Sequence, residues 1–118
     1  MTLHCPLNEA SAHLINRETL KKMKPSAFLV NTSRGGVVDS LALTEALNEG
    51  IIAGAGIDVL PTEPMKADDP LLSAKNCIIT PHIAWAAIES RRRCVSMAAE
   101  NLKAFQEGHP QNVVNRTT

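Results

Sequence analysis

Ile52-Ala-Gly-Ala-Gly-Ile-Asp-Val59 is a short, mostly apolar run, and its one charged residue, Asp58, lies close to its end. Shorter apolar runs lie on either side, as Ala27-Phe-Leu-Val-Asn31 and Cys77-Ile-Ile-Thr80, and helical patterns alternate with them along the chain. Continuous apolar runs of this kind are typical of strands buried on both faces of a parallel sheet. Strands that alternate with helices favour right-handed crossovers between parallel neighbours. The pattern therefore predicts an α/β fold with a doubly wound parallel sheet.

The other expected elements follow from capping residues and hydrophobic periodicity. Asn8, Asn16 and either Asp39 or Ser40 supply the caps, and Gly50 closes the second helix. The elements expected beside the three strands are a strand remnant at residues 3–5, a turn over 8–12, helices over 17–23 and 41–49, a proline-rich loop over 60–74 with one turn, and a long amphipathic helix over about 87–106.

Composition and charge exclude several classes of protein. The 118 residues carry 12 basic and 12 acidic side chains, so no net field attracts nucleic acid or an anionic membrane. No apolar run approaches the length of a membrane span, and the N-terminus lacks a secretory signal. The three cysteines are widely spaced, which is typical of free thiols in a reducing compartment. We therefore expect a cytoplasmic protein that binds neither nucleic acid nor a membrane.

Polar side chains follow the ends of the predicted strands. Asp58 ends one strand, Glu63 lies in the loop behind it, and His82 follows the next strand. The carboxyl ends of parallel strands share one edge of the sheet, where a carboxylate beside an imidazole makes a tunable proton donor. Arg34 follows a third strand, and a guanidinium there can grip a carboxylate through two parallel hydrogen bonds. Each has a simpler interpretation: a turn cap, a solvated glutamate, a structural histidine and a surface arginine.

Two other patterns carry little chemistry. Gly54-Ala-Gly56 resembles the start of a dinucleotide fingerprint, but Val59 stands where a third glycine is needed and no helix opens there. His4, Cys5 and His13 lack the spacing of a zinc site, so we expect no metal.

Several blocks of the chain together resemble a known family. Thr32-Ser-Arg-Gly-Gly-Val-Val-Asp39, Gly54-Ala-Gly-Ile-Asp-Val59 and Pro81-His-Ile-Ala-Trp85 resemble the signature blocks of the D-isomer-specific 2-hydroxyacid dehydrogenases. His4-Cys-Pro-Leu-Asn8 and Leu20-Lys-Lys-Met-Lys-Pro25 fit the same family, so the resemblance runs from residue 2 to about residue 115. The His-Ile-Ala-Trp ending resembles the glycerate dehydrogenase (hydroxypyruvate reductase) branch in particular.

The resemblance implies a role for each matching residue. The implied catalytic residues are Arg34, which holds the substrate carboxylate and carbonyl, His82, which is the acid/base, and Glu63, which hydrogen-bonds to that histidine. Asp58 would hold the nicotinamide carboxamide, and Trp85 would line the substrate pocket with Arg34 and His82. The implied contacts of NAD or NADP are His4, Cys5, Pro6, Asn8 (where the family often has threonine), Thr32, Ser33, Arg34, Asp58 and His82.

The resemblance also implies what surrounds these residues. Residues 1–118 would form the C-terminal half of a Rossmann-like NAD(P)-binding domain, with its terminal helix and tail. The glycine-rich phosphate loop and the substrate domain of the family would lie upstream, so we expect the isolated chain to be inactive. The implied reaction is the reduction of a small 2-keto acid, such as hydroxypyruvate or glyoxylate, to the D-2-hydroxy acid. Full-length members are expected to be homodimers.

Two alternatives stay open at this point. The chain could be a non-catalytic module that binds the cofactor or another protein. It could also be a broken gene product whose unpaired strand edge at residues 3–5 promotes aggregation or dimerisation. The intact set of Arg34, Glu63 and His82 favours the enzyme over the non-catalytic module.

Overall fold

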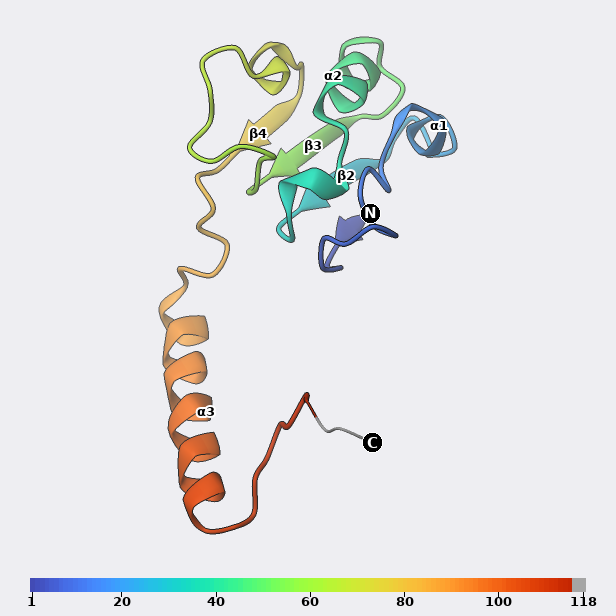
Figure 1. Cartoon of the computed structure of the whole chain (residues 1–118). Helices are drawn as coiled ribbons and strands as arrows, with labels where there is room; N and C mark the ends of the chain where they lie inside the picture. Colours follow the sequence, from blue (N-terminus) through green and yellow to red (C-terminus); the bar gives the residue numbers. More distant parts are fainter. Residues whose placement is uncertain (116–118) are drawn as a thin grey trace. The chain divides into compact units, whose positions relative to one another are not determined.

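The computed structural model describes residues 1–115, in two compact units that begin at Met1 and at Ala84 (Figure 1). The first unit, Met1–Ile83, contains a parallel sheet with short helices. The second unit begins with a short non-helical segment and contains one long helix. Each unit is described by itself below.

The sheet has four parallel strands that lie side by side in chain order: β1 (Thr2–Leu3), β2 (Phe28–Asn31), β3 (Gly54–Ile57) and β4 (Cys77–Ile79). The register places Asn31 opposite Ile57, and Ile57 opposite Ile79. The last residues of β2, β3 and β4 are thus neighbours, and the loops that follow these strands leave the sheet at the same edge. The predicted parallel α/β sheet is confirmed, although each strand is shorter than expected.

Two α-helices belong to the first unit, and their caps are those that the sequence predicts. In α1 (Arg17–Leu20), Asn16 Oδ1 accepts hydrogen bonds from the N–H groups of Glu18 and Thr19. In α2 (Ser40–Asn48), Asp39 Oδ1 accepts from the N–H of Ala42. Such caps satisfy N–H groups that have no partner within the helix.

The predicted length of α1 is wrong, because the helix ends at Leu20 and not at residue 23. Beyond Leu20 the N–H groups of Lys22 and Met23 bond to carbonyls three residues back, at 3.2 and 3.0 Å. Three-residue bonds tighten the chain into turns. Pro25 follows closely, and its ring disfavours helical backbone at the residue before it.

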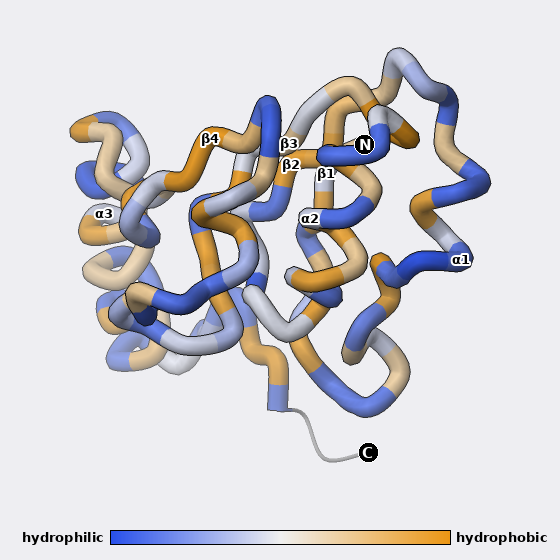
Figure 2. Tube along the Cα trace, turned by 90° about the horizontal axis from the view of Figure 1, so that it is seen from above, coloured by the Kyte–Doolittle hydropathy of each residue, from blue (hydrophilic) through white to orange (hydrophobic). Residues whose placement is uncertain are grey.

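The core of the first unit lies between the sheet and α2. Leu29 of β2 and Leu43 of α2 are both fully buried (0% exposed), and Ile52 before β3 is 1% exposed. The trace seen from above is mostly hydrophobic along the strands, whereas α3 alternates between hydrophobic and hydrophilic residues (Figure 2). Burial of such side chains is the main favourable contribution to folding.

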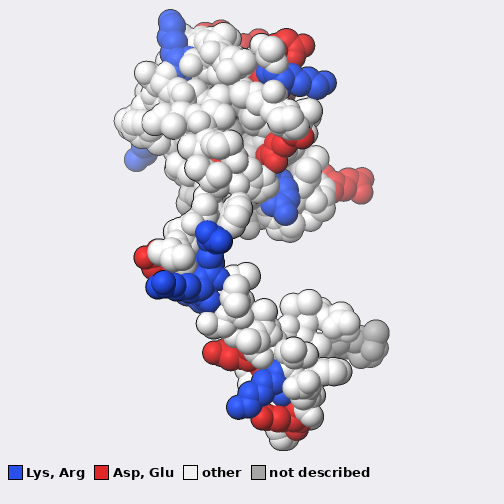
Figure 3. Space-filling model, turned by 90° about the vertical axis from the view of Figure 1, so that its left-hand side faces the viewer, with Lys and Arg blue, Asp and Glu red and all other residues white. Residues whose placement is uncertain are grey.

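The second unit contains α3 (Ile88–Gln106), which confirms the long helix predicted over about 87–106. Within this unit, its apolar residues Val95 and Phe105 are each 70% exposed. The three arginines of Arg91-Arg-Arg93 lie near its start, where Lys and Arg side chains gather in Figure 3. In the described part of the chain, none of the helices combines the length and the hydropathy needed to cross a membrane.

Candidate active site

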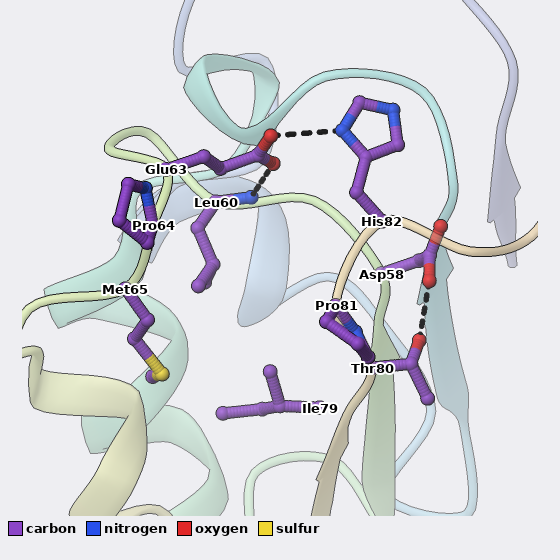
Figure 4. A pocket seen from close by; sticks show the side chains of 9 residues that line it. All are labelled: Asp58, Leu60, Glu63, Pro64, Met65, Ile79, Thr80, Pro81 and His82. Carbon is purple, nitrogen blue, oxygen red and sulfur yellow. Dashed lines mark hydrogen bonds and ion pairs between the residues drawn. The ribbon is translucent and has the colours of Figure 1, made fainter.

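A glutamate and a histidine from two different loops meet at the carboxyl edge of the sheet. Glu63 lies in the loop after β3 and His82 in the loop after β4 (Figure 4). His82 Nδ1 is 2.8 Å from Glu63 Oε2, and Glu63 Oε1 accepts a hydrogen bond from the N–H of Leu60 at 2.9 Å. The hydrogen bond from His82, and then that from Leu60, lower the pKa of the Glu63 carboxyl. Glu63 is thus held as a carboxylate facing the imidazole.

The backbone of His82 is held in an unusual conformation by Asp58. His82 has a φ of 54°, in the left-handed region that few side chains adopt. Its N–H donates to the carbonyl of Asp58 at 2.8 Å, and the N–H of Ile83 donates to Asp58 Oδ1 at 2.9 Å. The hydroxyl of Thr80 donates to the same Oδ1 at 2.5 Å. Asp58 is 5% exposed, so one buried carboxylate holds the turn that presents the imidazole.

In the structure, Asp58 therefore caps the turn of His82, which is the simpler of its two predicted roles. Contact with a nicotinamide stays a prediction for this residue.

The loop after β2 brings Arg34 toward the same edge of the sheet. Arg34 Nη1 donates to the carbonyl of Ser33 at 2.7 Å, and the guanidinium is close enough for its charge to contribute to lowering the pKa of Glu63. The next residue, Gly35, is buried against the backbone of the Glu63 loop. A Cβ at Gly35 would lie 2.0 Å from the carbonyl carbon of Leu60, so only glycine fits there.

Two hollows open at this edge of the first unit. One, of about 330 Å³, contains the His82–Glu63 pair (Figure 4) and is lined by Asp58, Leu60, Glu63, Pro64, Met65, Ile79, Thr80, Pro81 and His82. The other, of about 780 Å³, is lined by His4, Cys5, Pro6, Leu7, Thr32, Ser33 and Arg34. Both loops that the family resemblance implies as contacts of a dinucleotide, residues 4–6 and residues 32–34, thus line the second hollow.

Two predicted residues lie outside these hollows. Asn8 Oδ1 accepts a hydrogen bond from the N–H of Ser11 at 3.0 Å, which makes it the predicted cap of the turn. Trp85 belongs to the second unit, where the guanidinium carbon of Arg91 lies 6.0 Å from the centroid of its ring, within the range of a cation–π contact. The roles of Asn8 and Trp85 in ligand binding stay predictions.

Comparison with known proteins identifies the family. A sequence model of the NAD binding domain of the D-isomer specific 2-hydroxyacid dehydrogenases matches residues 1–84, most of the chain. The chain belongs to this family. The four-stranded parallel sheet and its helices are thus part of a Rossmann-like domain, as the sequence predicted.

Curated members of the family match almost the whole chain. It is 50% identical over 116 residues to a hydroxypyruvate reductase from Blautia hydrogenotrophica, and 53% identical over 117 residues to a glyoxylate reductase from Korarchaeum cryptofilum. These alignments cover 98% of this chain but 36% and 35% of the two relatives. The chain therefore spans about a third of the length of the curated 2-hydroxyacid dehydrogenases that it matches.

Solved structures of related enzymes have the same fold. An NAD complex of a D-isomer specific 2-hydroxyacid dehydrogenase from Lactobacillus delbrueckii superposes with a TM-score of 0.79 at 34% identity, covering 97% of this chain and 39% of that one. An acyclic imino acid reductase in complex with NADPH and D-Arg superposes with a TM-score of 0.82 at 34% identity, covering 96% and 36%. The domain of this family thus binds a nicotinamide dinucleotide.

Sequence reasoning missed two polar residues of this candidate site, Asn31 and Thr80. Both lie at strand ends, Asn31 as the last residue of β2 and Thr80 directly after β4. A polar residue that closes an apolar strand is a signal that could have found them. Among residues 1–115, no three histidine, cysteine or acidic side chains are grouped to hold a metal ion.

Proposed function

We propose that this chain carries the catalytic residues of an NAD(P)-dependent reductase that converts a small 2-keto acid, such as hydroxypyruvate or glyoxylate, into the D-2-hydroxy acid. The observation that carries the proposal is the 2.8 Å contact between His82 Nδ1 and Glu63 Oε2, beside the loop of Arg34. The names of the relatives, hydroxypyruvate reductase and glyoxylate reductase, support the substrate class.

His82 acts as the proton donor in this proposal. The Glu63 carboxylate accepts a hydrogen bond from Nδ1 and so fixes the orientation of the imidazole ring. We assign the transferred proton to Nε2, because Nδ1 is hydrogen-bonded to Glu63. The proton goes to the carbonyl oxygen of the keto acid as that oxygen gains negative charge.

Arg34 supplies the complementary charge. Its planar guanidinium can bind the substrate carboxylate through two hydrogen bonds, which orients the carbonyl toward His82. Arg34 Nη1 donates to the carbonyl of Ser33, so the side chain folds back over its own loop.

The hollow that includes His4, Cys5, Thr32 and Ser33 fits the nicotinamide half of NAD or NADP, because its size suits a small organic group and main-chain loops form its walls. When bound, the cofactor supplies the hydride.

The sequence of residues 1–118 contains no complete G-x-G-x-x-G motif of the kind that binds a pyrophosphate at a helix N-terminus. We therefore assign residues 1–118 to part of the NAD(P)-binding domain, including its terminal helix and tail, and expect little or no turnover from these residues alone. All three cysteines are free thiols, which supports a cytoplasmic location because the cytoplasm is a reducing compartment.

The test is a chimera in which this chain replaces the matching segment of the hydroxypyruvate reductase from Blautia hydrogenotrophica. We expect NADH-dependent reduction of hydroxypyruvate by the chimera, a loss of about 10²–10⁴-fold in kcat for His82→Ala, and a smaller loss for Glu63→Gln. An active chimera that is indifferent to His82→Ala would refute the catalytic role. Cofactor binding without turnover in a well-folded chimera would favour the non-catalytic module.

A further inference from the structure

Asn31 is a buried amide for which the proposed reaction has no direct use. It is the last residue of β2, and none of its surface is exposed (0%). Burial of an amide is unfavourable unless its polar atoms find partners. The partners of Asn31 therefore indicate why an amide, and not an aliphatic side chain, stands at this point of the core.

The side chain of Asn31 bonds to the loop that carries Arg34. Oδ1 accepts hydrogen bonds from the N–H of Ser33 at 3.0 Å and from the Ser33 hydroxyl at 2.8 Å. Nδ2 donates to the carbonyl of Arg34 at 3.0 Å. One rigid amide thus holds the backbone both before and after the Cα of Arg34, which limits the directions in which the guanidinium can project.

The main chain of Asn31 connects this loop to the other half of the site. Its carbonyl accepts a hydrogen bond from the N–H of Asp58 at 2.9 Å, and Asp58 holds the turn of His82. Asn31 therefore lies where the support of Arg34 meets the support of His82.

Few other side chains could make these contacts. Aspartate would keep the acceptor for Ser33 but lose the donor to the Arg34 carbonyl, and leucine would lose both. The donor and the acceptor of an amide are both needed to bond the two ends of this short loop.

We propose that Asn31 is a positioning residue that holds Arg34 in the geometry in which its guanidinium binds the keto acid. The proposal rests on the proposed function of Arg34. The hydrogen bonds to the loop can be tested without catalysis, so the failure of one proposal can be told from the failure of the other.

The first measurement is amide hydrogen exchange in the full chain and in Asn31→Ala. The N–H of Ser33 should exchange about tenfold faster or more in the variant, since it loses its acceptor. The N–H of Asp58 bonds to the main chain of residue 31 and should keep its rate. Equal acceleration of both amides would mean a general loss of stability and overturn the proposal, as would an unchanged rate at Ser33.

Thr44→Val is the matched control for burial. Thr44 is 5% exposed, and its hydroxyl donates to the carbonyl of Ser40 within α2, away from the Arg34 loop. The control should leave the exchange of Ser33 unchanged. Faster exchange at Ser33 in the control would mean that any buried polar deletion loosens the loop, which would also overturn the proposal.

The second measurement is a double-mutant cycle on kcat/KM for hydroxypyruvate in the active chimera. Asn31→Ala should lower kcat/KM by about 10–100-fold, and Asn31→Ala combined with Arg34→Ala should be little worse than Arg34→Ala alone, because both changes remove the same interaction. Fully additive losses would overturn the proposal.

If Asn31→Ala does not fold, Asn31→Asp, which has the same size, takes its place in the cycle. In Asn31→Asp the Ser33 amide should stay protected from exchange, because aspartate keeps the acceptor oxygen. Its kcat/KM should still fall, because the donor to the Arg34 carbonyl is lost, and an unchanged kcat/KM would overturn the proposal. If Arg34→Ala leaves kcat/KM unchanged, the proposed role of Arg34 and its positioning by Asn31 both fail, while the exchange rates still decide whether Asn31 holds the loop.

Discussion

Gly35 brings the loop of Arg34 against the backbone of the Glu63 loop, and Gly35→Ala tests what that contact contributes. A Cβ at residue 35 would lie 2.0 Å from the carbonyl carbon and 2.3 Å from the carbonyl oxygen of Leu60. Carbon atoms in contact are normally about 3.5–4.0 Å apart, so the two loops would have to separate by about 1.5 Å or more. Both obstructing atoms belong to the backbone, which cannot move aside as a flexible side chain can.

The separation should be measurable in stability and in rate. Overpacking of this kind lowers the free energy of unfolding by about 1–3 kcal/mol, which urea denaturation of the chain would show. A displacement of about 1 Å between catalytic groups can reduce the rate by about 100-fold, so kcat/KM of the chimera should fall by about that factor.

Gly56→Ala is the matched control for the same chemical change. A Cβ at Gly56 would meet only Val30 Cγ2, at 4.0 Å, which is an ordinary contact. The control should therefore unfold at nearly the same urea concentration as the unchanged chain. A Gly35→Ala variant as stable as this control, with full activity in the chimera, would refute the assigned contact between the two loops.

Three further predictions concern the core, the turn of His82 and the response to pH. Leu43→Ala should lower the free energy of unfolding by about 2–5 kcal/mol, because Leu43 is fully buried (0% exposed). Leu41→Ala, at a residue 58% exposed, should change it by less than about 0.5 kcal/mol, and urea denaturation of the two variants measures the difference. Thr80→Val should lower kcat of the chimera by about tenfold, because it removes the hydroxyl that donates to Asp58. Thr80→Ser should keep kcat near that of the unchanged chimera, because the serine hydroxyl can make the same hydrogen bond, and equal losses in the two variants would contradict this role of the hydroxyl. The pKa of Glu63 is lowered from 4.5, mainly by the hydrogen bond from His82, so the stability from this pair is fully present above that value and is lost as pH falls through the lowered pKa. Thermal unfolding of Glu63→Gln should thus depend less on pH below 4.5 than that of the unchanged chain.

The parts of the structure that could be predicted from sequence are those that depend on local chemistry. Asn16 and Asp39 cap helices because their side chains reach N–H groups two or three residues ahead, a geometry that does not depend on the rest of the fold. The meeting of Glu63 and His82 could be anticipated because both follow strands of one parallel sheet.

The parts that could not be predicted depend on distances between remote segments. Nothing in the local sequence of Gly35 indicates that the backbone of Leu60 lies against it. Likewise, the polar end of β4 could have marked Thr80 as a candidate, but nothing local indicates that Asp58, 22 residues earlier, accepts its hydrogen bond. The early end of α1 reflects a competition between helical and turn hydrogen bonds that periodicity does not resolve.

The order of the strands has a consequence for how the molecule is made. Because β1, β2, β3 and β4 are neighbours in chain order, each new strand that leaves the ribosome finds its partner already synthesised. Every pairing joins consecutive strands, which keeps the loops to be closed short. His82 follows the last of these strands, so it leaves the ribosome after Glu63 and after all four strands. The order of synthesis is thus the order in which the strands lie across the sheet, and the His82–Glu63 contact requires the last residue of this series.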